Sequence, residues 1–590
     1  MDIKQKIQNM TLEEKIGQKI MLDFRYWGPT GSEAMTRPDE TIGELITDNS
    51  IGGVILFANN LIDKLQIDTL TAWYAAMKTR AGIGLFIGTD NEGGDVFRLP
   101  RGDYASFPGN MALAAAIQGG AGEDLACQQG QQMARDMLSL HINCNFAPVV
   151  DVNTNPLNPV INVRAFSDDA ETVSRLAEKM ASGMKQQGLI TAYKHFPGHG
   201  STSTDSHTGL PRVDRSREEA FAIDIAPYKQ AIDRQAAPDM VMTAHIQYPA
   251  LDNSQVITRS GEKMTVPATM SREIQTHILR GELGYTGVTI SDALDMGAIA
   301  GHFSQEQAIE NVFAAGVDIA LMPVSLSSPS QAGRLPELIG YVVERVNKGY
   351  LSEADIDASV ARILELKSRY NLLSENEKTV ADNASPSALE KNIADLSVTV
   401  IVNRKGLLPL TDRTLRYFIL TPWGEQARGI ATVMSKEGYQ NVMAAKETEL
   451  SDEQVREHIA SCDVFLFGTR SAGFTPVVHD GGANEASNSD SYSGWLSYAV
   501  TLKKKCVHLS LRAPYDIVSY AENVDAALAA YACYGYDKDI WRGQSMIALA
   551  EVLTGKLRPQ GKLPVNLWHD YDVKTNKGVV AFPRGFGLSW

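Results

Sequence analysis

The sequence predicts an α/β protein of two domains, an N-terminal TIM-type (β/α)8 barrel followed by a C-terminal α/β sandwich. Over roughly the first 350 residues, short apolar runs alternate with segments of helical periodicity, a pattern typical of parallel strands joined by crossover helices. About eight such runs are present, and eight units favour a closed barrel over an open sheet. The chain of 590 residues is also too long for a single hydrophobic core.

The expected elements of the barrel follow one another along the chain. Thr11 and Glu14 form a capping box that predicts the start of an N-terminal helix. β-rich runs predict strands over residues 19–23, 51–57, 84–88, 142–150, 189–193, 240–244, 287–290 and 317–322. Helical periodicity predicts helices over residues 67–80, 124–140, 170–187, 217–235, 269–283 and 352–370.

Changes in composition along the chain predict where the domains meet. We expect the barrel to occupy residues 1–372 and a linker to occupy 373–395, because residues 371–388 are polar and rich in Ser, Asn and Glu. The sandwich domain is expected over 396–590, with strand-like runs at 398–402, 417–420, 464–468 and 507–511. Residues 471–493 are dense in Gly, Ser, Asn and Asp and predict one long loop.

The bulk properties exclude several classes of partner. A net charge of −15 disfavours nonspecific binding to nucleic acid or to an anionic membrane. No apolar run reaches the roughly 18 residues of a membrane span, and the N-terminus has no apolar signal core. Five scattered cysteines without CxxC spacing indicate buried free thiols. We therefore expect a cytoplasmic protein, or an exported one whose leader has been removed, and a monomer.

One stretch concentrates the polar chemistry. Residues 194–207, KHFPGHGSTSTDSH, hold one lysine, three histidines and one aspartate directly after the predicted strand 189–193. Pro197, Gly198 and Gly200 interrupt regular structure there, so these side chains are expected on a strand end and its following loop. Loops on a rigid scaffold are where binding and catalytic groups concentrate. The stretch predicts a site for a polar, hydroxyl-rich ligand.

Polar side chains also follow four other predicted strands at their carboxyl ends. These residues are Asp90, Asn91 and Glu92, then Asp151, then His245, and finally Ser291 and Asp292. Lys194 and His195 of the central stretch follow a fifth strand in the same way. In a barrel the carboxyl ends of all strands form one mouth. Residues two hundred positions apart are therefore expected to meet in a single pocket.

Two groups in this set are candidates for catalysis. Asp292 follows an apolar strand, where a carboxylate is solvated, paired or functional, although it also fits the N-cap of the next helix. His207 lies two residues after Asp205, which holds the imidazole in one tautomer if the loop turns. The alternative for this pair is a solvated loop with an incidental histidine.

The remaining candidates suit binding. Lys194, His195 and Arg164 offer donors for sugar hydroxyls and Asp90 offers an acceptor, although structural ion pairs explain each one equally well. His199 is expected to brace the loop. His195, His199, Asp205 and His207 are metal-ligand types, but Pro and Gly prevent a helical pair of ligands, so we expect no metal and no cofactor.

The central stretch resembles the signature of glycoside hydrolase family 3, in its β-N-acetylglucosaminidase branch. The resemblance extends to residues 90–94 (DNEGG), 145–151 (NFAPVVD), 164–166 (RAF) and 291–294 (SDAL). In the second domain, residues 407–410 (LLPL) and 561–565 (GKLPV) look like those of two-domain members. Asn91 departs from the pattern, in which Gln is commoner, and we expect little consequence.

The resemblance implies a retaining, exo-acting enzyme that removes terminal β-linked N-acetylglucosamine by double displacement. It implies Asp292 as the nucleophile, His207 as the general acid/base and Asp205 as its partner. It implies sugar-binding roles for Asp90, Asp151, Arg164, Lys194, His195 and His245. The substrate would be a small carbohydrate, and chitin oligomers, peptidoglycan fragments and glycoconjugates all stay open.

Four alternatives remain at this point. One is a family 3 β-glucosidase or β-xylosidase that takes its acid from the second domain, for which Glu485 or Asp480 are candidates. A second is a phosphorylase, because an uncharged histidine base repels a phosphate acceptor less than a carboxylate does. The others are a noncatalytic sugar-binding protein and a metal-dependent hydrolase.

Overall fold

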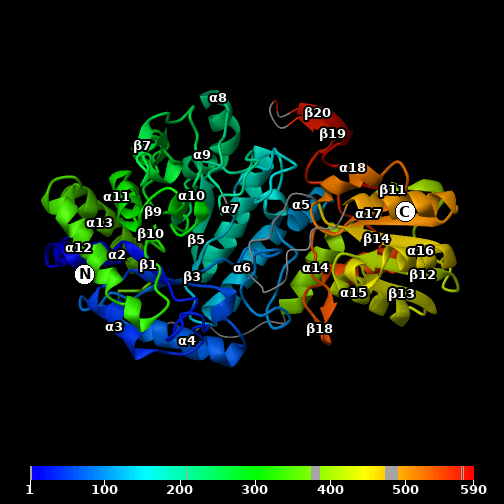
Figure 1. The fold of residues 1–590 in the computed structure, drawn as a ribbon, viewed down its shortest axis with the longest axis horizontal. Coiled ribbons are helices and arrows are strands. Elements are labelled where there is room, and N and C mark those ends of the chain that lie inside the picture. Colours follow the sequence, from blue (N-terminus) through cyan, green and yellow to red (C-terminus); the bar gives the residue numbers. More distant parts are fainter. Residues whose placement is uncertain (1–2, 208, 374–385, 472–488, 573–574, 576) are drawn as a thin grey trace.

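The computed structural model describes residues 3–207, 209–373, 386–471, 489–572, 575 and 577–590. Figure 1 shows two bodies side by side: a barrel formed by the blue-to-green part of the chain and a second domain formed by its yellow-to-red part. This arrangement confirms the predicted fold class. In the described part of the chain no helix is long and apolar enough to span a bilayer.

The barrel is built on one eight-stranded parallel sheet with the order β10-β1-β2-β3-β4-β5-β6-β9. A bridge between Ile290 and Ile319 links its two ends. Every strand residue is buried, as expected where helices cover the outside and side chains fill the inside. The strands are β1 (Ile20–Asp23), β2 (Gly53–Leu56), β3 (Phe86–Thr89), β4 (Cys144–Asn145), β5 (Ile190–Phe196), β6 (Met240–Thr243), β9 (Val288–Ile290) and β10 (Ala320–Leu321).

Helices surround this sheet, and several begin where the sequence predicts. Thr11 caps α2 with the expected capping box to Glu14, and α7 has the predicted bounds. The main helices are α2 (Leu12–Gln18), α3 (Glu40–Asp48), α4 (Lys64–Ala76), α5 (Asn110–Gln118), α6 (Asp124–Leu138), α7 (Ala170–Gln187), α9 (Ala226–Asp233), α11 (Gln305–Ala314), α12 (Arg334–Asn347) and α13 (Glu353–Arg369).

Three expected elements differ from the structure. Within the predicted strand 142–150 the regular ladder covers only β4, and an isolated bridge between Val149 and Lys194 follows beyond it. The predicted helix 217–235 divides into α8 (Arg217–Glu219), a π turn (Ala220–Asp224) and α9, which restarts with a proline in its first turn. The predicted helix 269–283 is a 3-10 turn (Ala268–Met270) followed by a π-helix (Glu273–Glu282).

The second domain is a sandwich of helices on both faces of a six-stranded sheet. Its order is β11-β16-β15-β14-β12-β13, and only the pair β11–β16 is antiparallel. Separate apolar clusters fill its two faces. The strands are β11 (Thr399–Asn403), β12 (Arg416–Thr421), β13 (Asn441–Lys446), β14 (Val464–Thr469), β15 (Lys505–Ser510) and β16 (Ala526–Ala529), and the longer helices are α15 (Gly424–Lys436), α16 (Asp452–Ser461), α17 (Ser489–Thr501) and α19 (Ser545–Thr554).

Two segments expected to be irregular contain helix. Helix α14 (Pro386–Ser397) occupies the second half of the expected linker and packs against α5 of the barrel and α19 of the second domain. Residues 374–385 of that linker lie outside the described residues. The expected loop over 471–493 ends in α17, and its residues 472–488 are also outside the described part.

Candidate active site

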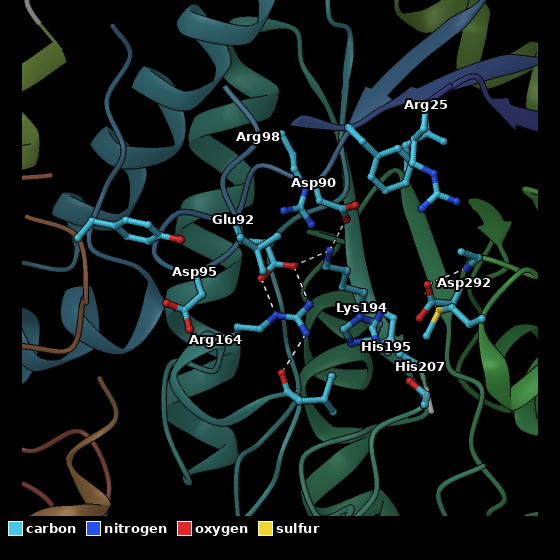
Figure 2. Close-up of a pocket in the computed structure, with 18 of the residues that line it drawn as sticks. Arg25, Asp90, Glu92, Asp95, Arg98, Arg164, Lys194, His195, His207 and Asp292 are labelled. Carbon is cyan, nitrogen blue, oxygen red and sulfur yellow. Dashed lines mark hydrogen bonds and ion pairs between the residues drawn. The ribbon is translucent and has the colours of Figure 1, made fainter. Parts of the chain in front are cut away.

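A cavity of about 520 Å³ lies at the carboxyl ends of the barrel strands, between the two domains. Barrel residues form one wall, and Figure 2 shows ten of them labelled, including Lys194, His207 and Asp292. The second domain contributes the opposite wall through Trp423, Glu425, Arg428, Arg470, Tyr534 and Arg542. The barrel therefore brings the expected strand ends together, and the site is completed by residues from a second sheet.

Two adjacent residues of β5, Lys194 and His195, both line this cavity. In a regular strand, successive side chains point to opposite faces of the sheet. Here the pairing between β5 and β6 shifts register between Lys194 and Phe196. The irregularity at the strand end explains how neighbouring donors come to face the same ligand space.

Glu92 is the centre of a buried charge cluster on one side of the cavity. Arg164 donates to it twice, from Nε at 2.9 Å and from Nη2 at 2.8 Å, and Lys194 Nζ lies 2.6 Å from its Oε1. Lys194 also donates to Asp90 Oδ1 at 2.7 Å (Figure 2). Burial of Glu92 would raise the pKa of its carboxyl, but Arg164 and Lys194 outweigh this and hold that pKa well below its usual value. Two cations and two carboxylates thus form a neutral, rigid unit.

Asp151 supports this wall from behind. Its Oδ2 lies 2.7 Å from His195 Nδ1, and its Oδ1 accepts from the backbone N–H of His199 at 2.7 Å. Burial alone would raise the pKa of Asp151. The charge and the hydrogen bond of His195 lower this pKa by more than burial raises it, so the carboxylate is ionised. Asp151 is fully buried and is not among the residues that line the cavity. Its position favours orienting His195 rather than touching a sugar.

Asp292 lies on the cavity wall just after β9. Its backbone N–H donates to the Thr243 carbonyl at 3.2 Å, and its Oδ1 accepts from the Ala293 N–H at 2.8 Å. The next helix, α10 (Gly297–Ala300), has Met296 at its N-cap, so the capping alternative for Asp292 does not hold. Burial raises the pKa of Asp292, but His195, His245 and His207 together lower it below the ordinary value.

His245 lies beside Asp292 but is not a lining residue of the cavity. It is fully buried, and its Nε2 is 2.9 Å from the Ala293 carbonyl oxygen. Burial lowers the pKa of His245, which favours the neutral ring. Its position favours bracing the segment that carries Asp292, in contrast to the sugar contact that the resemblance implies.

His207 and Asp205 form the compact pair that their spacing suggests. Asp205 Oδ1 accepts from the His207 backbone N–H at 2.9 Å and lies 2.7 Å from His207 Nδ1. The Asp205 side chain is buried, whereas that of His207 is 32% exposed and lines the cavity. Burial raises the pKa of Asp205, but its hydrogen bond to His207 lowers it more, so an ionised carboxylate faces Nδ1. Such a partner fixes the proton on Nδ1.

Backbone hydrogen bonds join the His207 loop to the segment after Asp292. The N–H of Ala298 donates to the Ser206 carbonyl at 3.1 Å, and that of Gly297 donates to the His207 carbonyl at 3.3 Å. His199 braces the same loop, with Nδ1 at 2.5 Å from Thr202 Oγ1, and burial lowers its pKa to about 4, so its ring is neutral. The two candidate catalytic groups therefore line one cavity on segments that are tied together.

Several cavity residues escape the sequence interpretation. Glu92 stands in a stretch that the sequence does mark, but its buried pairing with two cations has no local signal. Arg98 lines the cavity with only 4% exposure, and among the described residues neither its Nε nor its Nη1 has a hydrogen-bond partner. Since Arg98 also lines the cavity, its guanidinium is a candidate for contact with a ligand oxygen. The second-domain residues also carry no local motif.

No described group of three or more His, Cys, Asp or Glu side chains is arranged to hold a metal ion. Glu485 and Asp480, the acids of the alternative assignment, lie outside the described residues. The assignment of the acid to either of these two residues therefore stays a prediction.

Comparisons with known proteins agree with the geometry. The model of the glycosyl hydrolase family 3 N-terminal domain matches residues 11–366. The β-hexosaminidase A of Pseudoalteromonas piscicida is 36% identical over 589 residues, which cover 95% of this chain and 98% of that protein. The solved structure of a family 3 β-N-acetylglucosaminidase from Paenibacillus sp. strain FPU-7 has a TM-score of 0.77 and 29% identity, and the match covers 95% and 99% of the two chains. A β-hexosaminidase of Tolumonas auensis matches over 47% of this chain and 77% of its own length, at 36% identity.

Proposed function

Since the chain belongs to glycoside hydrolase family 3 and is a glycosidase, we propose that it removes terminal β-linked N-acetylglucosamine from small carbohydrates. The names of its full-length relatives, a β-hexosaminidase and a β-N-acetylglucosaminidase, support this choice of sugar. The observation that carries the proposal is the Asp205–His207 pair on the wall of the cavity that Asp292 also lines.

In the first step of the proposed reaction, the ionised carboxylate of Asp292 attacks the anomeric carbon through an oxocarbenium-like transition state. His207, protonated on both nitrogens, gives the proton of Nε2 to the leaving oxygen as the glycosidic bond breaks. Asp205 accepts the Nδ1–H throughout and stabilises the imidazolium. This takes the place of the second carboxylate that most retaining glycosidases use.

In the second step, neutral His207 takes a proton from water as the water oxygen attacks the same carbon. The bond to Asp292 breaks, and the sugar leaves with its original configuration. The lowered pKa of Asp292 suits both steps, because the carboxylate is then ionised at the start and a good leaving group at the end.

Sugar binding is proposed for the donors and acceptors around the Glu92 cluster. Lys194 and Asp90 are held together at 2.7 Å and present a donor and an acceptor to adjacent hydroxyls. Arg98 supplies N–H groups that lack a partner among the described residues. Arg164 is occupied on three nitrogens by Glu92 and the Val160 carbonyl, so its main effect is to hold Glu92. Trp423 and Tyr534 of the second domain line the opposite wall of the same cavity.

The proposal is tested by comparing Asp292→Ala and His207→Ala on two substrates. Asp292→Ala should abolish turnover of an aryl β-N-acetylglucosaminide. His207→Ala should slow cleavage of a disaccharide by about 10²–10⁴-fold, and slow the aryl substrate less, because an aryl oxygen leaves without help from a proton. His277→Ala is a matched control, because this exposed histidine also faces a carboxylate through Nδ1, at 2.7 Å from Glu273.

Near-normal rates in Asp292→Ala would contradict the proposed nucleophile. A native enzyme that cleaves aryl β-glucosides much faster than aryl β-N-acetylglucosaminides would contradict the proposed sugar. Equal losses on both leaving groups in His207→Ala would contradict the proposed acid.

A second candidate is phosphorolysis, favoured by the histidine at the acid/base position. A neutral imidazole does not repel an anionic acceptor as a carboxylate does. If phosphate is the acceptor, added phosphate accelerates sugar release and the product is a sugar 1-phosphate. Unchanged rates and free N-acetylglucosamine as sole product assign the enzyme to hydrolysis.

A further inference from the structure

We propose that Arg512 of the second domain is a positioning residue for the sugar-binding wall of the barrel, and that this is one reason why the second domain takes part in the reaction. The inference rests on the proposed function in one respect, that the Glu92 side of the cavity receives the sugar. Arg512 does not touch that space itself, since it is absent from the lining of the cavity.

Arg512 connects two barrel loops that approach the second domain. It follows β15 and is only 1% exposed, among the most deeply buried large side chains in the described part of the protein. Its Nε donates to Asp95 Oδ2 at 2.6 Å, and its Nη1 donates to Asn162 Oδ1 at 3.0 Å. Burial raises the pKa of Asp95, but Arg512 above all lowers it, so this is a buried, ionised pair.

Asp95 lies inside a tight turn that begins at Glu92 and ends at Val96. The backbone N–H groups of Glu92 and Gly93 donate to the Val96 carbonyl at 2.8 and 3.1 Å. Gly93 and Gly94 have φ of +88° and +60°, the left-handed conformation that glycine adopts without strain. Because these bonds close the turn over residues 92–96, a displacement of Asp95 is transmitted to Glu92.

Asn162 opens the short 3-10 helix (Asn162–Arg164) that carries Arg164. Its own φ is +47°, in the left-handed region that few residues other than glycine adopt and that asparagine adopts more readily than most. Its backbone N–H donates to Asn153 Oδ1 at 3.0 Å, and Asn153 Nδ2 donates to the hydroxyl of Tyr515 at 2.9 Å. Tyr515 follows Arg512 by three residues, so one segment of the second domain holds Asn162 from two directions.

These contacts close a ring. On the cavity side Glu92 and Arg164 are joined by two hydrogen bonds, and on the domain interface Asp95 and Asn162 are joined through Arg512. The turn and the 3-10 helix complete the circuit. Without the guanidinium, the buried Asp95 loses its ion pair, and the link between Asp95 and Asn162 through Arg512 is lost.

The test is a double-mutant cycle on kcat/KM with Arg512→Met, Asp95→Asn and the double variant. Each single change should lower kcat/KM by about 10–100-fold, because small misplacement of binding groups has effects of that size. The double variant should lose no more than the worse single variant, since both changes break the same link. KM should rise, whereas a smaller folded fraction alone would lower apparent kcat and leave KM unchanged.

Two further variants sharpen the test. Arg512→Lys keeps the charge but reaches one partner only, so it should restore part of the loss. Arg584→Met is the matched control, because it breaks another ion pair between the domains, Arg584–Asp168 at 2.7 Å, whose barrel partner does not line the cavity. This control should keep the native KM.

Unchanged KM in folded Arg512→Met, or losses that multiply in the double variant, would overturn the proposal. The cycle is measured on whichever aryl glycoside the native enzyme cleaves fastest. If that is not the β-N-acetylglucosaminide, the proposed sugar fails while the coupling between Arg512 and Asp95 is still measured.

Discussion

Replacing Glu92 by Gln should be among the most destabilising single changes in the barrel. The substitution keeps the shape but removes the charge that Arg164 and Lys194 share at 2.6–2.9 Å. At an effective dielectric constant of about 20, each such contact is worth about 5 kcal/mol of gross attraction, much of which offsets the burial of the charges. Removing one partner leaves a buried cation uncompensated and typically has a net effect of about 3–5 kcal/mol. At about 2 °C per kcal/mol for a large domain, we expect the melting midpoint to fall by about 6–10 °C.

The assay is thermal unfolding followed by circular dichroism between pH 3 and pH 8. Because the pKa of Glu92 is depressed in the folded state, its contribution is present above its unfolded pKa of about 4.3 and is lost as pH falls toward the folded value. The difference between native and Glu92→Gln protein should therefore shrink below about pH 4. Glu344→Gln is the matched control, since its ion pair with Lys348 is exposed, and should leave the midpoint unchanged. A shift in Glu92→Gln no larger than in this control would refute the reasoning.

Two further predictions concern single side chains of the site. Asp205→Asn leaves His207 in place but removes the carboxylate from Nδ1, so kcat should fall by about 10²–10⁴-fold with little change in KM; a native kcat in this variant would contradict the assigned pair. Arg98→Met removes N–H groups that lack a partner among the described residues, so KM should rise about tenfold or more while thermal stability is kept or increased; a clear loss of stability with native KM would show that Arg98 serves the fold instead.

The barrel and its mouth could be predicted because each depends on local pattern. Parallel strands that are buried on both faces appear as short apolar runs, and a polar residue directly after such a run marks a strand end. That reasoning placed Asp90, Lys194, His195 and Asp292 at one rim, and all four line the cavity. Pattern alone does not distinguish a residue at the rim from one behind it. Asp151 also follows a strand, yet it is fully buried beneath His195.

Other features of the site depend on contacts between residues that are far apart in the chain, which local sequence patterns do not predict. The three hydrogen-bonded or ionic contacts to Glu92 come from residues 72 and 102 positions away, so the acidic run at 90–92 is informative only once Arg164 and Lys194 are in place. The π segments before α9 and after Met270 are also not predictable from the sequence. Over so few residues, the spacing of their apolar side chains cannot be distinguished from that of an α-helix. Periodicity thus finds the helix and misses the widened turn.

The second wall of the cavity, like the first, includes residues that follow the carboxyl ends of parallel strands. Trp423 and Arg470 of this wall, and Arg512 behind it, follow β12, β14 and β15, three neighbouring parallel strands, at their carboxyl ends. In open α/β sheets ligands bind outside those ends, just as they do at the mouth of a barrel. The rule therefore selects these positions once the second sheet is known. The rule does not predict how the second sheet docks against the mouth of the barrel. That docking depends on contacts such as Arg512–Asp95, between residues 417 positions apart. Because the Arg512–Asp95 contact joins residues so far apart in the chain, the sequence alone does not predict it. We propose that this same contact holds the sugar-binding wall in place.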